Sequence, residues 1–175
     1  MRLGSPKTPD QTAKRRGFTI VELLIVIVVI GILAAITIVA YNGIQNRAND
    51  SVVQQDLSTD ARQFELYRTD SGTYPKNAAD LTAMKSGGKY PIKPSRSAYK
   101  DTNNLIYCNG DGTDYALIAV SKSGAAYVVS GNSPAPRAFS AYSPGQATIC
   151  PAAGMSNTGQ WGYTPTTGWA SWVSS

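Results

Sequence analysis

Histidine is absent from the 175-residue sequence, and cysteine occurs only twice. Without histidine there is no Ser-His-Asp or Cys-His catalytic group, no histidine metal ligand and no histidine switch near neutral pH. We therefore expect a protein that is not an enzyme and that has no cofactor. Charge is also sparse: residues 1–17 carry five Lys or Arg against one Asp, so +4 of the formal net charge of +5 lies there and +1 in the remainder. The high pI therefore does not by itself indicate nucleic-acid binding.

Residues 18–40 form an apolar run that contains a single charge, Glu22. Its 23 residues exceed the ~20 that a membrane-spanning helix needs. Three cations at positions 14–16 precede the run and the next cation is Arg47. This asymmetry predicts an N-terminus in the cytoplasm and a C-terminus outside. A secretory signal has a shorter apolar core with a small-residue cleavage site after it, whereas here the small residue, Gly17, precedes the run.

Glu22 is the informative residue of the run, because a carboxylate at mid-depth in a membrane helix costs about 2.5–3.5 kcal/mol. One interpretation is that its side chain reaches back to the lipid headgroups. The other is that it pairs with a cation, although the sequence has no Lys or Arg between Gly17 and Arg47. Cleavage after Gly17 would create one, the new amino group of Phe18. That amine cannot easily reach Glu22 of its own helix but can reach Glu22 of an axially shifted neighbour, so proteolysis would switch on assembly.

Residues 15–24, Arg-Arg-Gly-Phe-Thr-Ile-Val-Glu-Leu-Leu, resemble the prepilin signature of type IV pilins and type II secretion pseudopilins. The resemblance implies that a membrane peptidase cuts between Gly17 and Phe18 and that the new amino group of Phe18 is methylated. It also implies that Glu22 guides assembly. Two features depart from the family pattern. Val39 stands where many major pilins have Pro, so no proline kink is available there, and the leader of 17 residues is longer than the shortest ones.

The resemblance also implies a function: a structural subunit of a type IV pilus-like filament, which polymerises through its N-terminal helix after leader cleavage. The implied partners are itself, other pilins, the prepilin peptidase, and an inner-membrane assembly platform with its ATPase. The subunit would begin as a single-pass protein of the cytoplasmic membrane and end in an extracellular or periplasmic filament. One alternative is a pseudopilin of a type II secretion or DNA-uptake machine. An alternative of another class is a monomeric membrane-tethered surface binding protein, which would need neither cleavage at Gly17 nor Glu22.

Beyond the apolar run the pattern becomes amphipathic and predicts that one helix continues from Phe18 to about Arg68. The apolar positions recur every three to five residues, at Ile44, Ala48, Val52, Leu57, Ala61, Phe64 and Tyr67. A membrane anchor joined to a separate short helix is the alternative. Gly72 followed by Pro75 is a helix stop signal, and residues 77–84 predict a short helix.

Cys108 and Cys150 both lie in the part expected outside the membrane. Two thiols in an oxidising compartment indicate a disulfide, and two unrelated free thiols are the alternative. In many pilins a cysteine pair fastens the C-terminal loop to the sheet, so the resemblance implies the same role for this pair.

Three apolar runs, at 104–108, 115–120 and 125–129, are separated by turn-forming segments and predict antiparallel strands. A sheet of these strands would place one face on the amphipathic helix. The expected fold is therefore α+β and pilin-like: a long, partly transmembrane N-terminal helix packed against a small antiparallel sheet, with a disulfide-closed C-terminal loop. The expected organisation has four parts, a leader over 1–17, a transmembrane half-helix over 18–40, an amphipathic half-helix over 41–69 and a head over 70–175.

A basic stretch with interleaved Tyr90 and Tyr99 and no acidic residue follows the short helix. Its cations are Lys85, Lys89, Lys93, Arg96 and Lys100. Such a stretch could hold DNA through phosphate contacts and base stacking. A solvated loop is the interpretation that we favour, because nothing in the sequence indicates that these side chains converge.

Two further segments carry polar or aromatic side chains that could bind a ligand. Asn109, Asp111 and Asp114 surround two glycines, and we favour a hairpin turn over a calcium site because the spacing matches no complete calcium loop. The tail over 156–175 has three tryptophans among Gly, Ser and Thr and no charge. It either forms a contact surface for a neighbour or a glycan, or folds back on the head.

Overall fold

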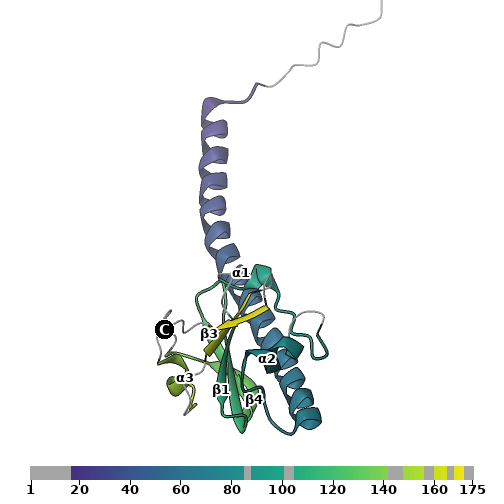
Figure 1. Cartoon of the computed structure of the whole chain (residues 1–175). Helices are drawn as coiled ribbons and strands as arrows, with labels where there is room; N and C mark the ends of the chain where they lie inside the picture. The colour runs from purple at the N-terminus through teal and green to yellow at the C-terminus, as the bar shows by residue number, and fades with distance from the viewer. Residues whose placement is uncertain are drawn as a thin grey trace, which may run out of the picture. The chain divides into compact units, whose positions relative to one another are not determined.

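The computed structural model describes residues 17–84, 88–100, 105–141, 148–155, 160–164 and 168–171, with the backbone alone for Arg96 and for the last two ranges. The chain divides into two compact units, residues 1–41 and 42–175, and each is described by itself. Helix α1, Ile20–Ser71, contributes to both (Figure 1). The helix is continuous, as the sequence predicted, so a separate short helix after the membrane anchor does not form.

The first unit consists, in its described part, of a short extended start and α1 up to Tyr41. Every side chain from Gly17 to Tyr41 is exposed, and the large apolar ones range from 47% exposed at Val29 to 86% at Ile20. Within the described part of the chain, α1 is the one helix long and apolar enough to cross a membrane, with a mean hydropathy of 3.3 over its apolar window. Length and composition alone support that statement.

The C-terminal end of α1 follows the predicted stop signal. Gly72 adopts a φ of +78°, a left-handed conformation that favours glycine, and its N–H donates to the Arg68 carbonyl at 2.8 Å. The short helix α2, Ala78–Leu81, begins at the Asn77 cap, whose side chain accepts from the Asp80 N–H at 3.0 Å. It continues into the 3-10 turn η1, Thr82–Met84, so the predicted short helix is confirmed.

The buried face of α1 differs in its first half from the predicted one. Ile44, Ala48 and Val52 are exposed, whereas Val53 is fully buried. The members of the buried face are Asn49, Val53, Leu57, Asp60, Ala61 and Phe64. Their spacing of three and four residues keeps them on one side, and Val52 lies about 100° away from Val53 around the helix axis. The sequence prediction was therefore correct from Leu57 onward and wrong before it.

In the described part of the chain the sheet has six strands in the order β4-β3-β2-β1-β5-β6, and all neighbours are antiparallel. The strands are β1 Leu105–Gly110, β2 Asp114–Val120, β3 Ala126–Ser130, β4 Ser133–Ala138, β5 Gln160–Thr164 and β6 Gly168–Ser171. The central three confirm the predicted runs, whereas β4, β5 and β6 were not predicted. Pro134 and Pro136 argue against a strand except at a sheet edge, which is where β4 lies. The backbone of the aromatic tail pairs with β1, so this part folds back on the head.

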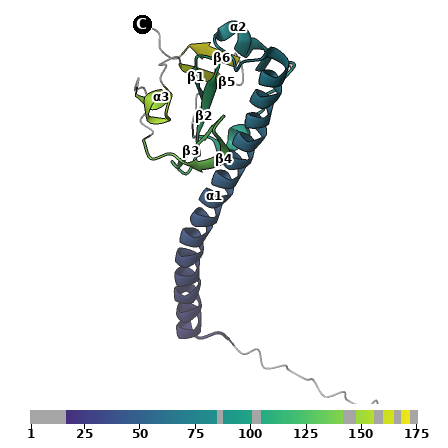
Figure 2. The same cartoon turned by 90° about the horizontal axis from the view of Figure 1, so that it is seen from below.

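Each central strand is buried on both faces. One face, with Tyr107, Tyr115 and Leu117, packs against α1, and Phe64 of α1 stacks on the rings of Tyr107 and Tyr115 at centroid distances of 4.9 and 4.8 Å. The opposite face is covered by the segment that contains α3, Ile149–Ala152 (Figure 2). Burial on both sides explains why these strands read as continuous apolar runs instead of alternating ones.

Candidate assembly site

Glu22 lies in the first turn of α1 and is held by the residue that caps the helix. Its Oε2 atom accepts from the backbone N–H of Thr19 at 2.8 Å and from the Thr19 hydroxyl at 2.9 Å. The N–H of Glu22 in turn donates to the Thr19 hydroxyl oxygen at 3.2 Å. This reciprocal arrangement is a capping box, which satisfies backbone donors that a helix start leaves free. It keeps the carboxylate hydrogen-bonded at the end of an otherwise apolar segment.

The capping role of Thr19 was not predicted from the sequence. Its signal was present, because Thr19-Ile-Val-Glu22 matches the Ser/Thr-x-x-Glu pattern of a capping box directly before an apolar run.

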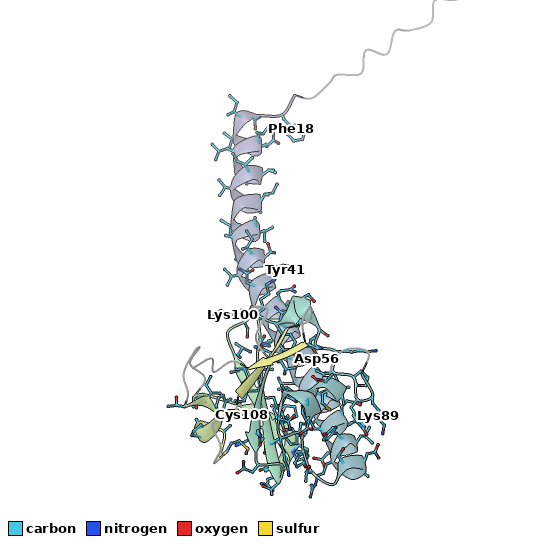
Figure 3. The ribbon with its side chains drawn as sticks, viewed as in Figure 1. Phe18, Tyr41, Asp56, Lys89, Lys100 and Cys108 are labelled. Carbon is cyan, nitrogen blue, oxygen red and sulfur yellow. A yellow bond between two sulfur atoms is a disulfide. The ribbon has the colours of Figure 1, made fainter. Side chains whose placement is uncertain are left out.

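Gly17 and Phe18 lie immediately before α1, in a segment without helical hydrogen bonds (Figure 3). The Phe18 side chain is 85% exposed, and a Cβ added at Gly17 would meet no atom within 4 Å. The peptide bond between them is thus outside the helix and free of steric cover from the described residues. An enzyme could reach this bond without unwinding α1.

The predicted disulfide is present between Cys108 of β1 and Cys150 of α3, with the two Cα atoms 5.4 Å apart. Both residues are fully buried within the apolar cluster on the face of the sheet turned away from α1. The bridge therefore ties the C-terminal covering segment to a central strand and does not contribute to the contact with α1.

The residues of the basic stretch have different environments. Lys89 pairs with Asp70 of α1 at 2.8 Å, and this contact lowers the pKa of the Asp70 carboxyl. Lys93 and Lys100 are exposed, while Lys85 and the side chain of Arg96 lie outside the described residues. Tyr90 and Tyr99 are only 6% and 7% exposed and belong to the core against α1, so their rings are not presented for base stacking.

Asn109, Asp111 and Asp114 form the predicted turn between β1 and β2. Asp111 and Gly112 adopt φ values of +55° and +80°, the left-handed conformation of a tight hairpin. The oxygens of Asp114 accept from the Tyr115 N–H and from Asn132, both at 2.7 Å. No group of three or more acidic, His or Cys side chains with metal-ligand geometry occurs among the described residues.

Comparison with known proteins finds a family match at the N-terminal end of the chain. Residues 12–38 match the family described as the prokaryotic N-terminal methylation motif. The type IV wide pilus major component of Thermus thermophilus is 42% identical over 69 residues, which cover 39% of this chain and 53% of that protein. The present chain thus spans about half the length of that relative.

Type II secretion system core proteins G are similar over a longer stretch. The Escherichia coli protein is 28% identical over 65% of this chain and 79% of its own length, and the Pseudomonas aeruginosa protein is 30% identical over 51% and 65%. No solved structure matches the chain. The motif defines the class, proteins that carry a prokaryotic N-terminal methylation signal. Within this class the chain is similar to type IV pilins and to type II secretion pseudopilins.

Proposed function

We propose that this protein is a structural subunit of a type IV pilus-like filament, inserted in the cytoplasmic membrane as a precursor and polymerised through α1 after leader cleavage. The observation that carries the proposal is the unit up to Tyr41. It presents an apolar helix surface with a single charge, Glu22, and no buried side chain among its described residues, and the methylation motif covers most of it.

The apolar surface of this unit requires a nonaqueous environment. Complete burial of one Leu, Ile or Val side chain stabilises by about 1.5–3 kcal/mol relative to exposure in water, and residues 20–40 carry many of them. A membrane supplies that environment to the precursor. Outside the membrane, the corresponding helices of other subunits would have to supply it, which makes a bundle of such helices the expected core of the filament.

Cleavage between Gly17 and Phe18 would change the electrostatics of the helix start. The new amino group carries a positive charge one turn before Glu22, whose carboxylate is held by Thr19. Pairing with the amine of an axially shifted subunit would neutralise both charges and fix the stagger between helices. In this proposal Thr19 stabilises the carboxylate before assembly, and the neighbour's amine binds it in the filament.

The same geometry serves a pseudopilin of a type II secretion or DNA-uptake machine, which is the second candidate. It is favoured by the longer alignment with the secretion proteins and by Val39 in place of the proline of many major pilins. A nucleic-acid contact through Lys93 and Lys100, both exposed, belongs to that candidate. In either case we propose a nonenzymatic role, with self, other pilins, a prepilin peptidase, and an assembly platform and ATPase as partners.

The proposal is tested by intact mass and N-terminal sequencing of the protein recovered from membranes and from sheared filaments. We expect a chain that begins at methylated Phe18. A full-length chain beginning at Met1, in cells with a working prepilin peptidase, would contradict the proposal and favour the membrane-tethered binding protein. Filaments recovered outside the cell would support the pilus, and recovery confined to the envelope would support the secretion or uptake candidate.

Two variants of Glu22 separate its charge from its capping role. Glu22→Gln keeps the capping box, because Gln serves at this position as Glu does, but it removes the charge. We expect this variant to insert and to be cleaved but not to enter filaments. Glu22→Ala removes both features and is the comparison. Filament yields for Glu22→Gln equal to those of the unmodified protein would show that the ion pair is not needed.

A further inference from the structure

A buried carboxylate on α1 has no role in the proposed assembly. Asp60 is 2% exposed and lies one helical turn after the half-buried Asp56. The Oδ2 atom of Asp60 has no hydrogen-bond partner among the described residues. An ionised carboxylate in such a position is strongly disfavoured, and buried carboxyl groups without a counter-charge usually retain their proton.

Both carboxylates hold the same segment of the head, residues 91–99, which includes the 3-10 turn η2, Arg96–Ala98. The Ser95 N–H and hydroxyl donate to Asp56 at 2.7 and 3.2 Å. The Lys93 N–H donates to Asp60. Tyr99, at the end of the segment, is 7% exposed, and its hydroxyl is close enough to Asp56 and Asp60 for their charges to act on it. The segment is thus attached to α1 through two neighbouring carboxyl groups.

Of the described residues, the charged and titratable groups around Asp60 do not neutralise it. Asp56 on α1 is a like charge, since residues four apart share one helix face, and Tyr99 and Tyr115 are the phenols that interact with Asp60 from the segment and from β2. The Lys93 side chain is exposed. The two ion pairs of the described residues, Arg68–Glu65 and Lys89–Asp70, include neither Asp56 nor Asp60.

A proton suits this site better than a metal ion. The groups directed at the carboxylates are N–H and O–H donors, which would point their hydrogens at a cation and repel it. A proton on Asp60 removes the like-charge repulsion and leaves those donors in place. Burial, together with the charge of Asp56, raises the pKa of Asp60 to about 8.

We propose that residues 91–99 form a proton-operated clamp on α1: a proton held by Asp60 beside Asp56 keeps the segment docked, and its loss to alkaline solvent releases the segment. On release, the two ionised carboxylates repel one another and gain water, while the Lys93 and Ser95 amides become open to solvent. This switch lies in the head and is independent of filament assembly.

The clamp is tested by hydrogen–deuterium exchange of the full chain in detergent micelles between pH 6.5 and 9.5, corrected for the intrinsic pH dependence of exchange. Up to about pH 8 the docked Asp60 holds a proton that a solvent-exposed Asp60 has already lost, so each pH unit of rise toward 8 favours release. We therefore expect protection of peptides over residues 91–99 to fall about tenfold per pH unit from pH 6.5 up to about 8 and to level off above it. Peptides of β2 serve as the internal control and should not change. Unchanged protection over 91–99 across this pH range would overturn the proposal.

Asp60→Asn is the matched variant, because it has nearly the same shape and no charge at any pH. We expect its segment to stay protected throughout. A pH dependence equal to that of the unmodified protein would overturn the proposal. A carboxyl carbon NMR titration of the unmodified chain supplies a test that needs no folded variant: a midpoint near 8 for Asp60 supports the clamp, and one below about 5 overturns it.

Arg96 follows Ser95 in the sequence, so a variant must test whether its positive charge, and not the proton, holds residues 91–99 against α1. We expect Arg96→Gln to keep the alkaline release. If this variant released the segment already at neutral pH, the guanidinium and not the proton would hold the clamp, and the proposal would be wrong.

Discussion

Removal of the Cys108–Cys150 disulfide should weaken one layer of the head and not the other. The bridge joins residues 42 positions apart, and closing a loop of that length lowers the entropy of the unfolded chain by an amount worth about 4 kcal/mol in the chain-entropy model. The measured loss is often smaller, since strain and residual structure offset part of it. We therefore expect the Cys108→Ala/Cys150→Ala double variant to lose about 2–4 kcal/mol of unfolding free energy.

The location of the loss follows from the two apolar clusters. The bridge holds α3 against the outer face of the sheet, where Ile106 and Ile118 are buried, whereas Phe64 of α1 packs against the inner face. Without the bridge, the outer cover is retained only by its own apolar contacts. We expect the peptide over 148–155 to lose its protection from hydrogen exchange first, while the peptide over 53–64 keeps most of its protection.

The assay combines urea unfolding of the full chain in detergent with hydrogen exchange, with and without a thiol reductant. Reduced wild-type protein and the untreated double variant should behave alike, and the variant should not respond to the reductant. Equal loss of protection at 148–155 and at 53–64 would refute the assignment of the bridge to one layer. An unchanged free energy of unfolding would refute the stabilising role itself.

Three further predictions concern the head. Folding raises the pKa of Asp60 from 3.8 to about 8. The stabilisation that protonated Asp60 gives the folded state is therefore complete below pH ~3.8 and is lost as pH rises toward 8. In urea titrations, Asp60→Asn should add up to about 5 kcal/mol to the free energy of unfolding at pH 8 and little at pH 3.5. A Cβ at Gly131 would lie 2.8 Å from the Tyr74 hydroxyl, so Gly131→Ala should lower the free energy of unfolding by about 1–3 kcal/mol. Gly43 is helical and a Cβ there would have no neighbour within 4 Å, so Gly43→Ala should raise it by about 0.5–1 kcal/mol. Thermal unfolding distinguishes the two. Phe64→Ala should cost about 3–5 kcal/mol, because it empties the space between two stacked tyrosines, and an effect below 1 kcal/mol in the same unfolding assay would contradict the packing.

The elements that the sequence predicted are those whose signals are local. The apolar run after Gly17, the prepilin signature and the stop at Gly72 each depend on neighbouring residues, and each predicts its element without knowledge of the rest of the chain. The central strands were predictable because burial on both faces makes them continuously apolar. The disulfide was predictable because two cysteines allow only one pairing within the chain.

The remaining features depend on what the chain packs against. Pro134 and Pro136 are compatible with a strand only because β4 is an edge, and edge position is a property of the assembled sheet. The exposure of Val52 and the burial of Val53 depend on which side of α1 the sheet covers. Asp60 reads in the sequence as an ordinary solvated charge of a helix. It becomes a buried, protonated group only because residues 91–99, more than 30 positions away in the chain, pack over it. Its spacing from Leu57 and Phe64 is that of the buried face, but the sequence does not indicate which segment covers it.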